Sequence, residues 1–213
     1  MVKIIRIFFC LPIFIHALSH GAAILDGKLP SDNKRYPTFL LALQLIEERK
    51  LHTIVETGTS RCGSANFAGD GGSTLIFGQW VLEHGGEFYS VDIDPNAIRT
   101  ATKALNTKAP SIHFVTSDSI AFLARFRRPI DFLYLDSFDF DPNDPLPSQY
   151  HHLQEIQAAY FLLSQDSVIL IDDCAISGGG KGKLVIEYLL SQGWEIAAAE
   201  YQVLLIRKTS ASH

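Results

Sequence analysis

The sequence predicts an open three-layer αβα sandwich, in which helices cover both faces of a mostly parallel, seven-stranded sheet. From about residue 36 onward, short apolar runs rich in β-branched residues alternate with longer amphipathic segments. This alternation is typical of repeated βα units around a parallel sheet. The last two apolar runs are joined by too few residues for a crossover helix, so we expect them to form a C-terminal antiparallel hairpin.

Seven strands and six helices are expected from these runs. The strands are expected at residues 53–56, 88–92, 112–116, 132–136, 168–172, 195–199 and 203–207, and the helices near Thr38, Ser73, Pro95, Ser119, Gln149 and Lys181. Asp94 and Pro95 offer an N-cap followed by a proline in the first turn, which favours a helix start there. Gly193 is typical of a helix end.

The composition indicates one globular domain with a sizeable core. The chain has 213 residues, of which 47% are apolar and 19% charged. The formal net charge is -5, and basic residues are scattered apart from a short cluster at Arg125, Arg127 and Arg128. A nucleic-acid partner is not expected, because clustered positive charge is its usual footprint.

The N-terminal segment has the layout of a secretory signal peptide. Lys3 and Arg6 lie beside an apolar run over residues 4–18, and small residues follow it. The run is shorter than the roughly 20 apolar residues that span a bilayer comfortably. We therefore expect a hydrophobic leader over residues 1–23, which favours export or membrane association, ahead of a domain over residues 36–208. An ordinary N-terminal helix packed on a cytoplasmic protein, or a misassigned start, is the alternative.

The three cysteines, Cys10, Cys62 and Cys174, lack the paired spacings of zinc sites and disulfide frameworks. Isolated thiols are expected. In an oxidising compartment, a bond between Cys62 and Cys174 is the alternative, because the expected fold places both on loops at one rim of the sheet.

Polar residues end five successive strands of the expected sheet. They are Glu56, Asp92, the run Ser117, Asp118 and Ser119, then Asp136 and Asp172. In an open α/β sheet, ligands bind beyond the carboxyl ends of the strands. A single acidic strand end is typical of a solvated cap, whereas five at equivalent positions indicate a ligand site.

Two glycine loops lie next to these strand ends. Residues 57–60 follow the first strand, and residues 70–74 then open a helix whose N-terminus offers amide donors to an anion. The spacing departs from G-x-G-x-x-G, which argues against a dinucleotide pyrophosphate site.

The second loop, residues 177–183, lacks the phosphate-loop pattern. We interpret it as a mobile active-site loop, in which Lys181 contacts an anionic group of the substrate.

Four segments resemble the successive motifs of class I S-adenosylmethionine (SAM)-dependent methyltransferases. They are Glu56-Thr57-Gly58, Val91-Asp92-Ile93-Asp94, Ser117-Asp118-Ser119 and Tyr134-Leu135-Asp136. The resemblance covers essentially everything after residue 50. It implies a Rossmann-like fold, SAM as the cofactor and a small-molecule methyl acceptor.

The resemblance also implies which residues contact SAM. Gly58, Ser60 and Ser73 would line its methionine part. Asp92 would accept hydrogen bonds from the ribose hydroxyls, and Asp118 with its neighbours would face the adenine. The full implied set is Glu56, Gly58, Ser60, Ser73, Asp92, Ile93, Ser117, Asp118, Ser119 and Asp136. The insertion between Ser60 and Gly71 departs from the tight turn of relatives and is expected to fold over the cofactor.

Three aspartates are predicted to hold a divalent cation. Asp136 and the pair Asp172 and Asp173 end neighbouring strands, which lie roughly 4.8 Å apart, and carboxylate oxygens suit magnesium or manganese. The pattern resembles the catechol-type and macrocin-type O-methyltransferases, in which the metal binds the acceptor hydroxyl and lowers its pKa. The alternative is a metal-free site, with Asp172 or Asp173 capping the following loop.

Two candidates for the catalytic base follow the fourth strand. Asp139 occupies the neighbourhood in which the catechol type places a lysine. His152, or the adjacent His151, opens the next helix and is the second candidate. The intervening segment, residues 138–149, is long and proline-rich, and we interpret it as an acceptor-binding lid.

Metal-assisted O-methylation of a small-molecule hydroxyl is therefore the function that the sequence favours. A metal-free methyltransferase acting on nitrogen or another acceptor is the first alternative. A SAM-binding domain without turnover is the second, because the acceptor side carries no unambiguous base. A nicotinamide-dependent reductase is disfavoured, since the dinucleotide loop and a hydride-site pair are not evident.

Overall fold

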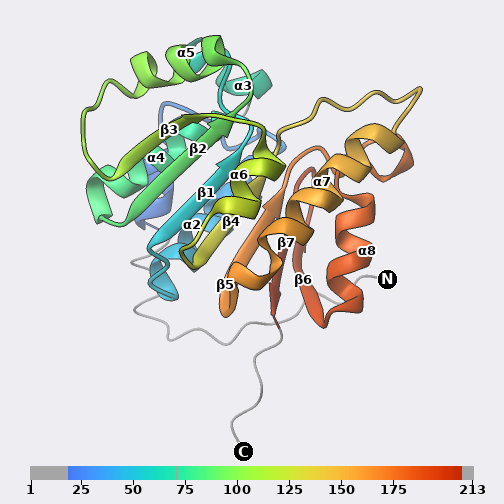
Figure 1. Cartoon of the computed structure of the whole chain (residues 1–213). Coiled ribbons are helices and arrows are strands. Elements are labelled where there is room, and N and C mark those ends of the chain that lie inside the picture. The colour runs from blue at the N-terminus through green and yellow to red at the C-terminus, as the bar shows by residue number, and fades with distance from the viewer. Residues whose placement is uncertain (1–18, 71, 208–213) are drawn as a thin grey trace, which may run out of the picture.

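A single mixed sheet forms the centre of the molecule in the computed structural model, which describes residues 19–70 and 72–207 (Figure 1). The strands are β1 (Thr53–Thr57), β2 (Glu87–Asp92), β3 (Ile112–Thr116), β4 (Ile130–Leu135), β5 (Leu163–Ile171), β6 (Trp194–Ala199) and β7 (Val203–Arg207). Their order is β3-β2-β1-β4-β5-β7-β6. β7 runs antiparallel to both of its neighbours, whereas the other pairs are parallel. The predicted Rossmann-like sandwich with a C-terminal hairpin is confirmed.

Helices cover both faces of this sheet. The principal helices are α2 (Tyr36–Glu48), α4 (Ser73–His84), α5 (Pro95–Leu105), α6 (Ser119–Arg125), α7 (Leu146–Ala159) and α8 (Lys183–Ser191). Figure 1 shows α6, α7 and α8 on one face and α2 and α4 on the other. Short helical turns are η1 (Gly63–Ala65), α3 (Phe67–Asp70), η2 (Tyr160–Leu162) and η3 (Ser177–Gly179).

Each face of the sheet has its own apolar core. Phe77 of α4 lies at the centre of the first, with its ring 5.0 Å from that of Phe132 and 5.7 Å from those of Phe39 and Tyr134. Leu133, Ile169 and their neighbours form the second with α6, α7 and α8. Burying one large apolar side chain contributes roughly 1.5–3 kcal/mol, so these two layers hold the strand ends in a fixed arrangement.

The predicted boundaries fail where polar or proline residues belong to regular structure. β5 begins at Leu163, five residues before the predicted start, because residues 164–166 are polar and exposed although they belong to the strand. α7 begins at Leu146 rather than near Gln149, since prolines suit the first turn of a helix. The predicted lid is thus shorter than residues 138–149. Asp94 caps α5 as predicted, with its side chain accepting from the amide of Asn96.

The packed part of the chain begins before the predicted boundary at residue 36. Residues 19–25 are helical, and Ile24, Leu25 and Leu29 are buried in the core beside α2. Most of the predicted leader, residues 1–18, lies outside the described residues. Among the residues that the structure does describe, no helix has the length and apolar character needed to cross a membrane.

The alternative pairing of Cys62 with Cys174 is not present. Neither of these two cysteines forms a disulfide; Cys62 is exposed, and Cys174 is buried after β5. Cys10 lies outside the described residues.

Candidate active site

Two adjoining cavities open at the carboxyl ends of β1, β2, β4 and β5. The first has a volume of about 330 Å³ and the second about 260 Å³. Both are lined by Gly58, Asp92, Ile93 and Ser137, so they meet at the tips of β1, β2 and β4. The first cavity extends to charged residues after β4 and β5, and the second extends to Asp118, Ser119, Phe138 and His151. The cavities lie at the strand ends where the sequence pattern predicts a ligand site.

Gly58 allows the tips of β1 and β4 to approach each other. Its φ is +80°, a left-handed conformation that favours glycine. A Cβ at this position would lie only 2.3 Å from the carbonyl oxygen of Asp136. The residue therefore has to be glycine for the cavity floor to close as it does.

Asp92 is held rigidly at the junction of the two cavities. One carboxylate oxygen accepts from the amide of Thr59 at 3.0 Å, and the other accepts from the amide of Asp94 at 2.8 Å. Each oxygen retains a second lone pair that can accept from a ligand hydroxyl. The geometry suits the predicted contact with a ribose diol, and that role stays a prediction.

Glu56 does not line either cavity, contrary to the prediction. It is fully buried beneath the loop and accepts hydrogen bonds from Ser73, from Thr74 at 2.7 Å and from Ser90 at 2.6 Å. Burial raises the pKa of Glu56 to about 7, although the three hydroxyls favour its charged form. The carboxylate joins β1, α4 and β2 beneath the loop instead of contacting a ligand.

Ser117 is the second correction among the predicted cofactor residues. It lines a separate hollow with Phe122 and Arg125, because the chain turns away from the cavities as β3 ends. The other predicted residues, Gly58, Ser60, Ser73, Asp92, Ile93, Asp118, Ser119 and Asp136, line one cavity or both. The insertion after Ser60 forms η1 and α3, and Arg61 and Gly69 of that segment also line the first cavity.

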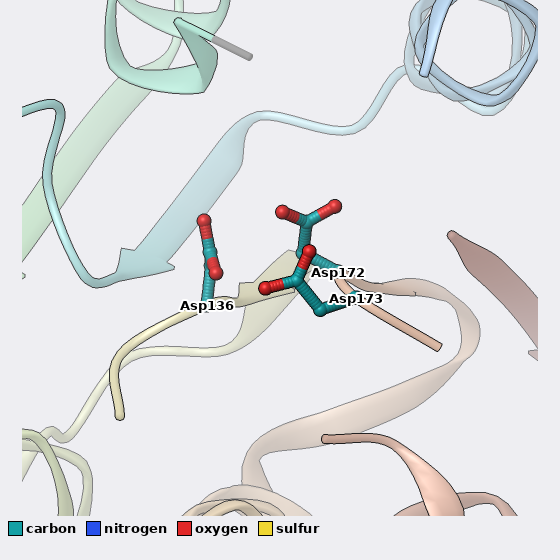
Figure 2. Close-up of side chains that lie close together, drawn as sticks. All are labelled: Asp136, Asp172 and Asp173. Atoms are coloured by element: carbon teal, nitrogen blue, oxygen red, sulfur yellow. The ribbon is translucent and has the colours of Figure 1, made fainter. Parts of the chain in front are cut away.

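The three predicted metal ligands converge at the far end of the first cavity. Asp136 follows β4, and Asp172 and Asp173 follow β5 (Figure 2). One oxygen from each lies within 4.8 Å of the others, a donor set whose chemistry suits a hard cation. Asp172 is buried, whereas Asp136 and Asp173 are half-buried.

Two basic side chains already contact this cluster of aspartates. Arg35, immediately before α2, donates from Nε and Nη2 to Asp172 at 2.8–3.1 Å, and Nη2 also reaches Asp173 at 3.2 Å. The ammonium of Lys181 lies 2.5 Å from Asp136 Oδ1 and 3.3 Å from Asp173 Oδ2. Lys181 therefore pairs with protein carboxylates, whereas the loop pattern predicted a contact with an anionic group of the substrate.

The carboxylates keep both basic groups charged. Burial opposes the charge on Lys181, but the attraction of Asp136 and Asp173 outweighs it, so the pKa of Lys181 is raised. The pKa of Arg35 is raised in the same way, against burial, by its hydrogen bonds to Asp172.

The cluster as arranged does not fit a metal ion. Both oxygens of Asp172, both oxygens of Asp173 and Oδ1 of Asp136 contact Arg35, Lys181 or the hydroxyl of Tyr201. A divalent ion needs several of these oxygens at about 2.0–2.6 Å, which brings it into the position of the ammonium. Metal binding here remains a prediction of the sequence, and it requires Lys181 to move.

The two predicted bases differ in their access to the cavities. Asp139 lines the first cavity, but it forms a two-point ion pair with Arg61 at 2.8 and 2.9 Å, which lowers its pKa. His152 lines neither cavity. It is fully buried in α7, with Nδ1 2.7 Å from the carbonyl oxygen of Ser148, so its position contradicts a role as the base. His151 faces the second cavity instead.

Sequence reasoning missed two residues of the site, Arg35 and Tyr201. Arg35 lies 137 positions before Asp172, outside every motif, and Tyr201 belongs to the turn between β6 and β7. Tyr201 donates to Asp173, and the guanidinium of Arg35 lies 4.6 Å from its ring centre. The available signal for Arg35 was its place just before the helix predicted near Thr38.

Comparison with known proteins gives a family match over just over half of the chain. Residues 67–174 match the model of a family described as a methyltransferase domain. No curated protein sequence matches the chain.

Several solved structures share the fold. The MycE methyltransferase from the mycinamycin biosynthetic pathway, in complex with Mg, S-adenosylhomocysteine (SAH) and mycinamycin VI, has a TM-score of 0.60 at 14% identity, over 92% of this chain and 56% of that one. A methyltransferase from Geobacter sulfurreducens has a TM-score of 0.53 at 15% identity, over 96% and 92%. The SAH-bound methyltransferase PaMTH1 from Podospora anserina has a TM-score of 0.52 at 14% identity, over 92% of this chain and 88% of that one. At these identities the likeness concerns the fold alone.

Proposed function

The chain belongs to the methyltransferase domain family, and on that premise we propose that this SAM-dependent methyltransferase acts on a hydroxyl oxygen of a small polar molecule. One observation carries the proposal. The cavity that contains the predicted cofactor residues continues, without a break in its lining, to the charged cluster of Asp136, Asp172, Asp173, Arg35 and Lys181.

In this proposal the cofactor occupies the second cavity and the near part of the first. Asp92 accepts from the ribose hydroxyls, while Ile93 and Phe138 offer apolar surface to the adenine. The methionine part then lies along Gly58, Ser60 and Ser73, which line the first cavity. The reactive methyl group therefore faces the charged end of the cavity.

The charged end favours a small, polar acceptor over nucleic acid. The lining of the first cavity as a whole has six carboxylates and three basic groups: Asp92, Asp94, Asp136, Asp139, Asp172 and Asp173, against Arg35, Arg61 and Lys181. A phosphate backbone is repelled by such a lining, and the chain has a net charge of -5. A cavity of about 330 Å³, part of which holds the cofactor, also limits the size of the reacting end of the acceptor.

The proposed transfer is a single displacement. The acceptor oxygen attacks the methyl carbon, the carbon–sulfur bond breaks with its electron pair remaining on sulfur, and SAM becomes SAH. The hydroxyl proton passes to a carboxylate of the cavity, for which Asp139 is the candidate that the sequence provides. The protein contributes chiefly by holding oxygen, methyl carbon and sulfur in line.

Metal assistance is the finer form of this proposal. The sequence predicts it from the three aspartates, whereas the contacts of Lys181 oppose it. The reaction is therefore to be measured both with magnesium and with excess chelator.

The test begins with calorimetric titration of SAM and SAH into the full chain. SAH release is then measured with a panel of small phenols, sugars and hydroxy acids, each paired with its deoxy counterpart, and products are identified by a mass gain of one methylene. We expect SAM to bind to the chain alone. We expect SAH to be released only when the added compound has a hydroxyl group. Equal methylation of the deoxy compounds, or of amines that lack a hydroxyl, would overturn the choice of oxygen.

A further inference from the structure

We infer that Lys181 is a built-in cation that binds the acceptor oxygen in the place where related enzymes use a divalent metal. The ammonium bridges Asp136 and Asp173, from the tips of two neighbouring strands, at 2.5 and 3.3 Å. It therefore lies between the carboxylates whose oxygens are close enough together to hold a metal. The contact of Lys181 with the acceptor oxygen rests on the proposed function, whereas the exclusion of a metal ion by Lys181 does not.

The loop that carries Lys181 is built to hold the side chain in this position. Lys181 is 2% exposed, and its own amide donates to the carbonyl of Asp173 at 3.2 Å. Gly180 packs so closely that a Cβ there would lie 1.7 Å from the same carbonyl oxygen. A surface lysine that happened to reach an acidic patch would have neither constraint.

A second clamp comes from α7. The side-chain amide of Gln149 donates to the carbonyls of Gly178 and Gly180, at 3.1 and 3.0 Å. This glutamine is buried, so the loop is fixed from the helix layer as well as from β5. The ammonium therefore cannot withdraw from the aspartates by a simple movement of an exposed loop.

The charge of the cluster is already largely compensated. Asp136, Asp172 and Asp173 carry three formal negative charges, and Arg35 and Lys181 return two positive ones. A divalent ion is attracted by a cluster of three carboxylates but is repelled by an ammonium in the middle of it. The electrostatic reason for recruiting a metal is therefore absent while Lys181 is in place.

The ammonium can also perform the task that the metal has in metal-assisted enzymes. Its contacts with Asp136 and Asp173 account for two of its three N–H groups, and Lys181 lines the first cavity. The third N–H group is available to an acceptor oxygen. When the hydroxyl proton leaves for a carboxylate and the oxygen attacks the methyl carbon, this positive charge stabilises the developing negative charge on oxygen.

The inference is tested by metal binding, which requires neither acceptor nor turnover. Manganese is titrated against the full chain, and the electron paramagnetic resonance signal of free Mn²⁺ is recorded for the wild type, Lys181→Met and Lys183→Met, the control at an exposed lysine outside both cavities. We expect the wild type and Lys183→Met to leave the signal unchanged. Lys181→Met exposes the three carboxylates and should reduce the signal by one ion per chain.

The wild-type titration decides the question even if Lys181→Met does not fold. Stoichiometric Mn²⁺ binding by the wild type that is abolished by Asp136→Asn would overturn the inference and support the metal-assisted form. A folded Lys181→Met variant that leaves the Mn²⁺ signal unchanged would overturn it as well. Loss of SAM binding or of methyl transfer, by contrast, bears on the proposed function and leaves the metal titration unaffected.

Discussion

Glu56 and Asp172 are both fully buried carboxylates near the ends of central strands, yet they have different partners. Glu56 accepts from three hydroxyl groups and lies beneath the β1 loop. Asp172 accepts from the guanidinium of Arg35 and lines the first cavity. A carboxylate with neutral donors fixes a loop internally, whereas one with cationic partners becomes part of a charged cavity wall. The partner, rather than the strand-end position, separates a structural acid from a candidate functional one.

The largest effect is expected from removing the cationic partner of Asp172. Arg35→Met leaves that carboxylate buried without its counter-charge, which should lower the free energy of unfolding by about 3–5 kcal/mol. Urea unfolding at pH 7 measures the change. Arg61→Met is the matched control, because its ion pair with Asp139 is exposed and should contribute less than about 1 kcal/mol. Equal losses from the two variants would contradict the distinction.

The burial of Glu56 among neutral partners gives the next effect, which depends on pH because burial raises the pKa of this carboxyl. Its folded-state pKa of about 7 lies above the ordinary value of 4.5, so the folded chain retains a proton that the unfolded chain releases. The stabilising effect of that proton is complete below about pH 4.5 and is lost as the pH rises to about 7. Relative to Glu56→Gln, the wild type should lose roughly 3 kcal/mol of unfolding free energy across this window.

This difference is obtained from urea unfolding of the two proteins at matched pH values. Subtracting the unfolding free energy of Glu56→Gln from that of the wild type removes the contributions of the other titrating groups. A wild-type curve that stays parallel to that of Glu56→Gln between pH 4.5 and 7 would show that the carboxylate is not perturbed.

Asp92 is a third kind of carboxylate, which accepts from backbone amides and also lines both cavities. Asp92→Ala should weaken SAM binding by about 1–3 kcal/mol, because two charge-assisted acceptors for the ribose are lost. Calorimetric titration measures the change. Asp141→Ala, an exposed site outside both cavities, is the control. Unchanged SAM affinity in folded Asp92→Ala would refute the assignment.

The smallest effect is expected at Asp94, an exposed carboxylate that accepts a hydrogen bond from the amide of Asn96. Asp94→Ala removes the N-cap of α5 and should lower the unfolding free energy by about 1 kcal/mol. A fall in the midpoint of thermal unfolding measures it, with Asp94→Ser as a variant that preserves the cap. A loss as large as that of Arg35→Met would show that Asp94 has a structural role beyond capping.

The sequence predicts the sheet and the place of the site well, because both follow from local patterns. Strands such as β3 and β7 agree with the prediction at both ends, since each is an apolar run bounded by polar residues. The position of the cavities follows from the carboxyl ends of parallel strands. Both features can be predicted from residues that are neighbours in the chain.

The partners of the site residues could not be predicted in this way. The sequence assigned Glu56 and Asp92 the same kind of role, and only the tertiary contacts of Ser73 and Ser90 separate them. The sequence likewise predicted that a divalent cation neutralises the three aspartates, because nothing local indicates that Arg35 and Lys181 reach them. Such contacts join segments far apart in the chain.

The reversed direction of β7 has a consequence for the order in which the protein is made. Because β7 runs against β5, the turn before it lies at the cavity edge, and Tyr201 in that turn binds Asp173. Arg35, which also binds Asp173, lies near the beginning of the described chain. During synthesis Arg35 emerges before every strand of the sheet, whereas Tyr201 emerges only after β6. A nascent chain that stops before β6 therefore lacks the tyrosine partner of Asp173, so the hydrogen bonds of the aspartate cluster are complete only after nearly the whole domain has left the ribosome.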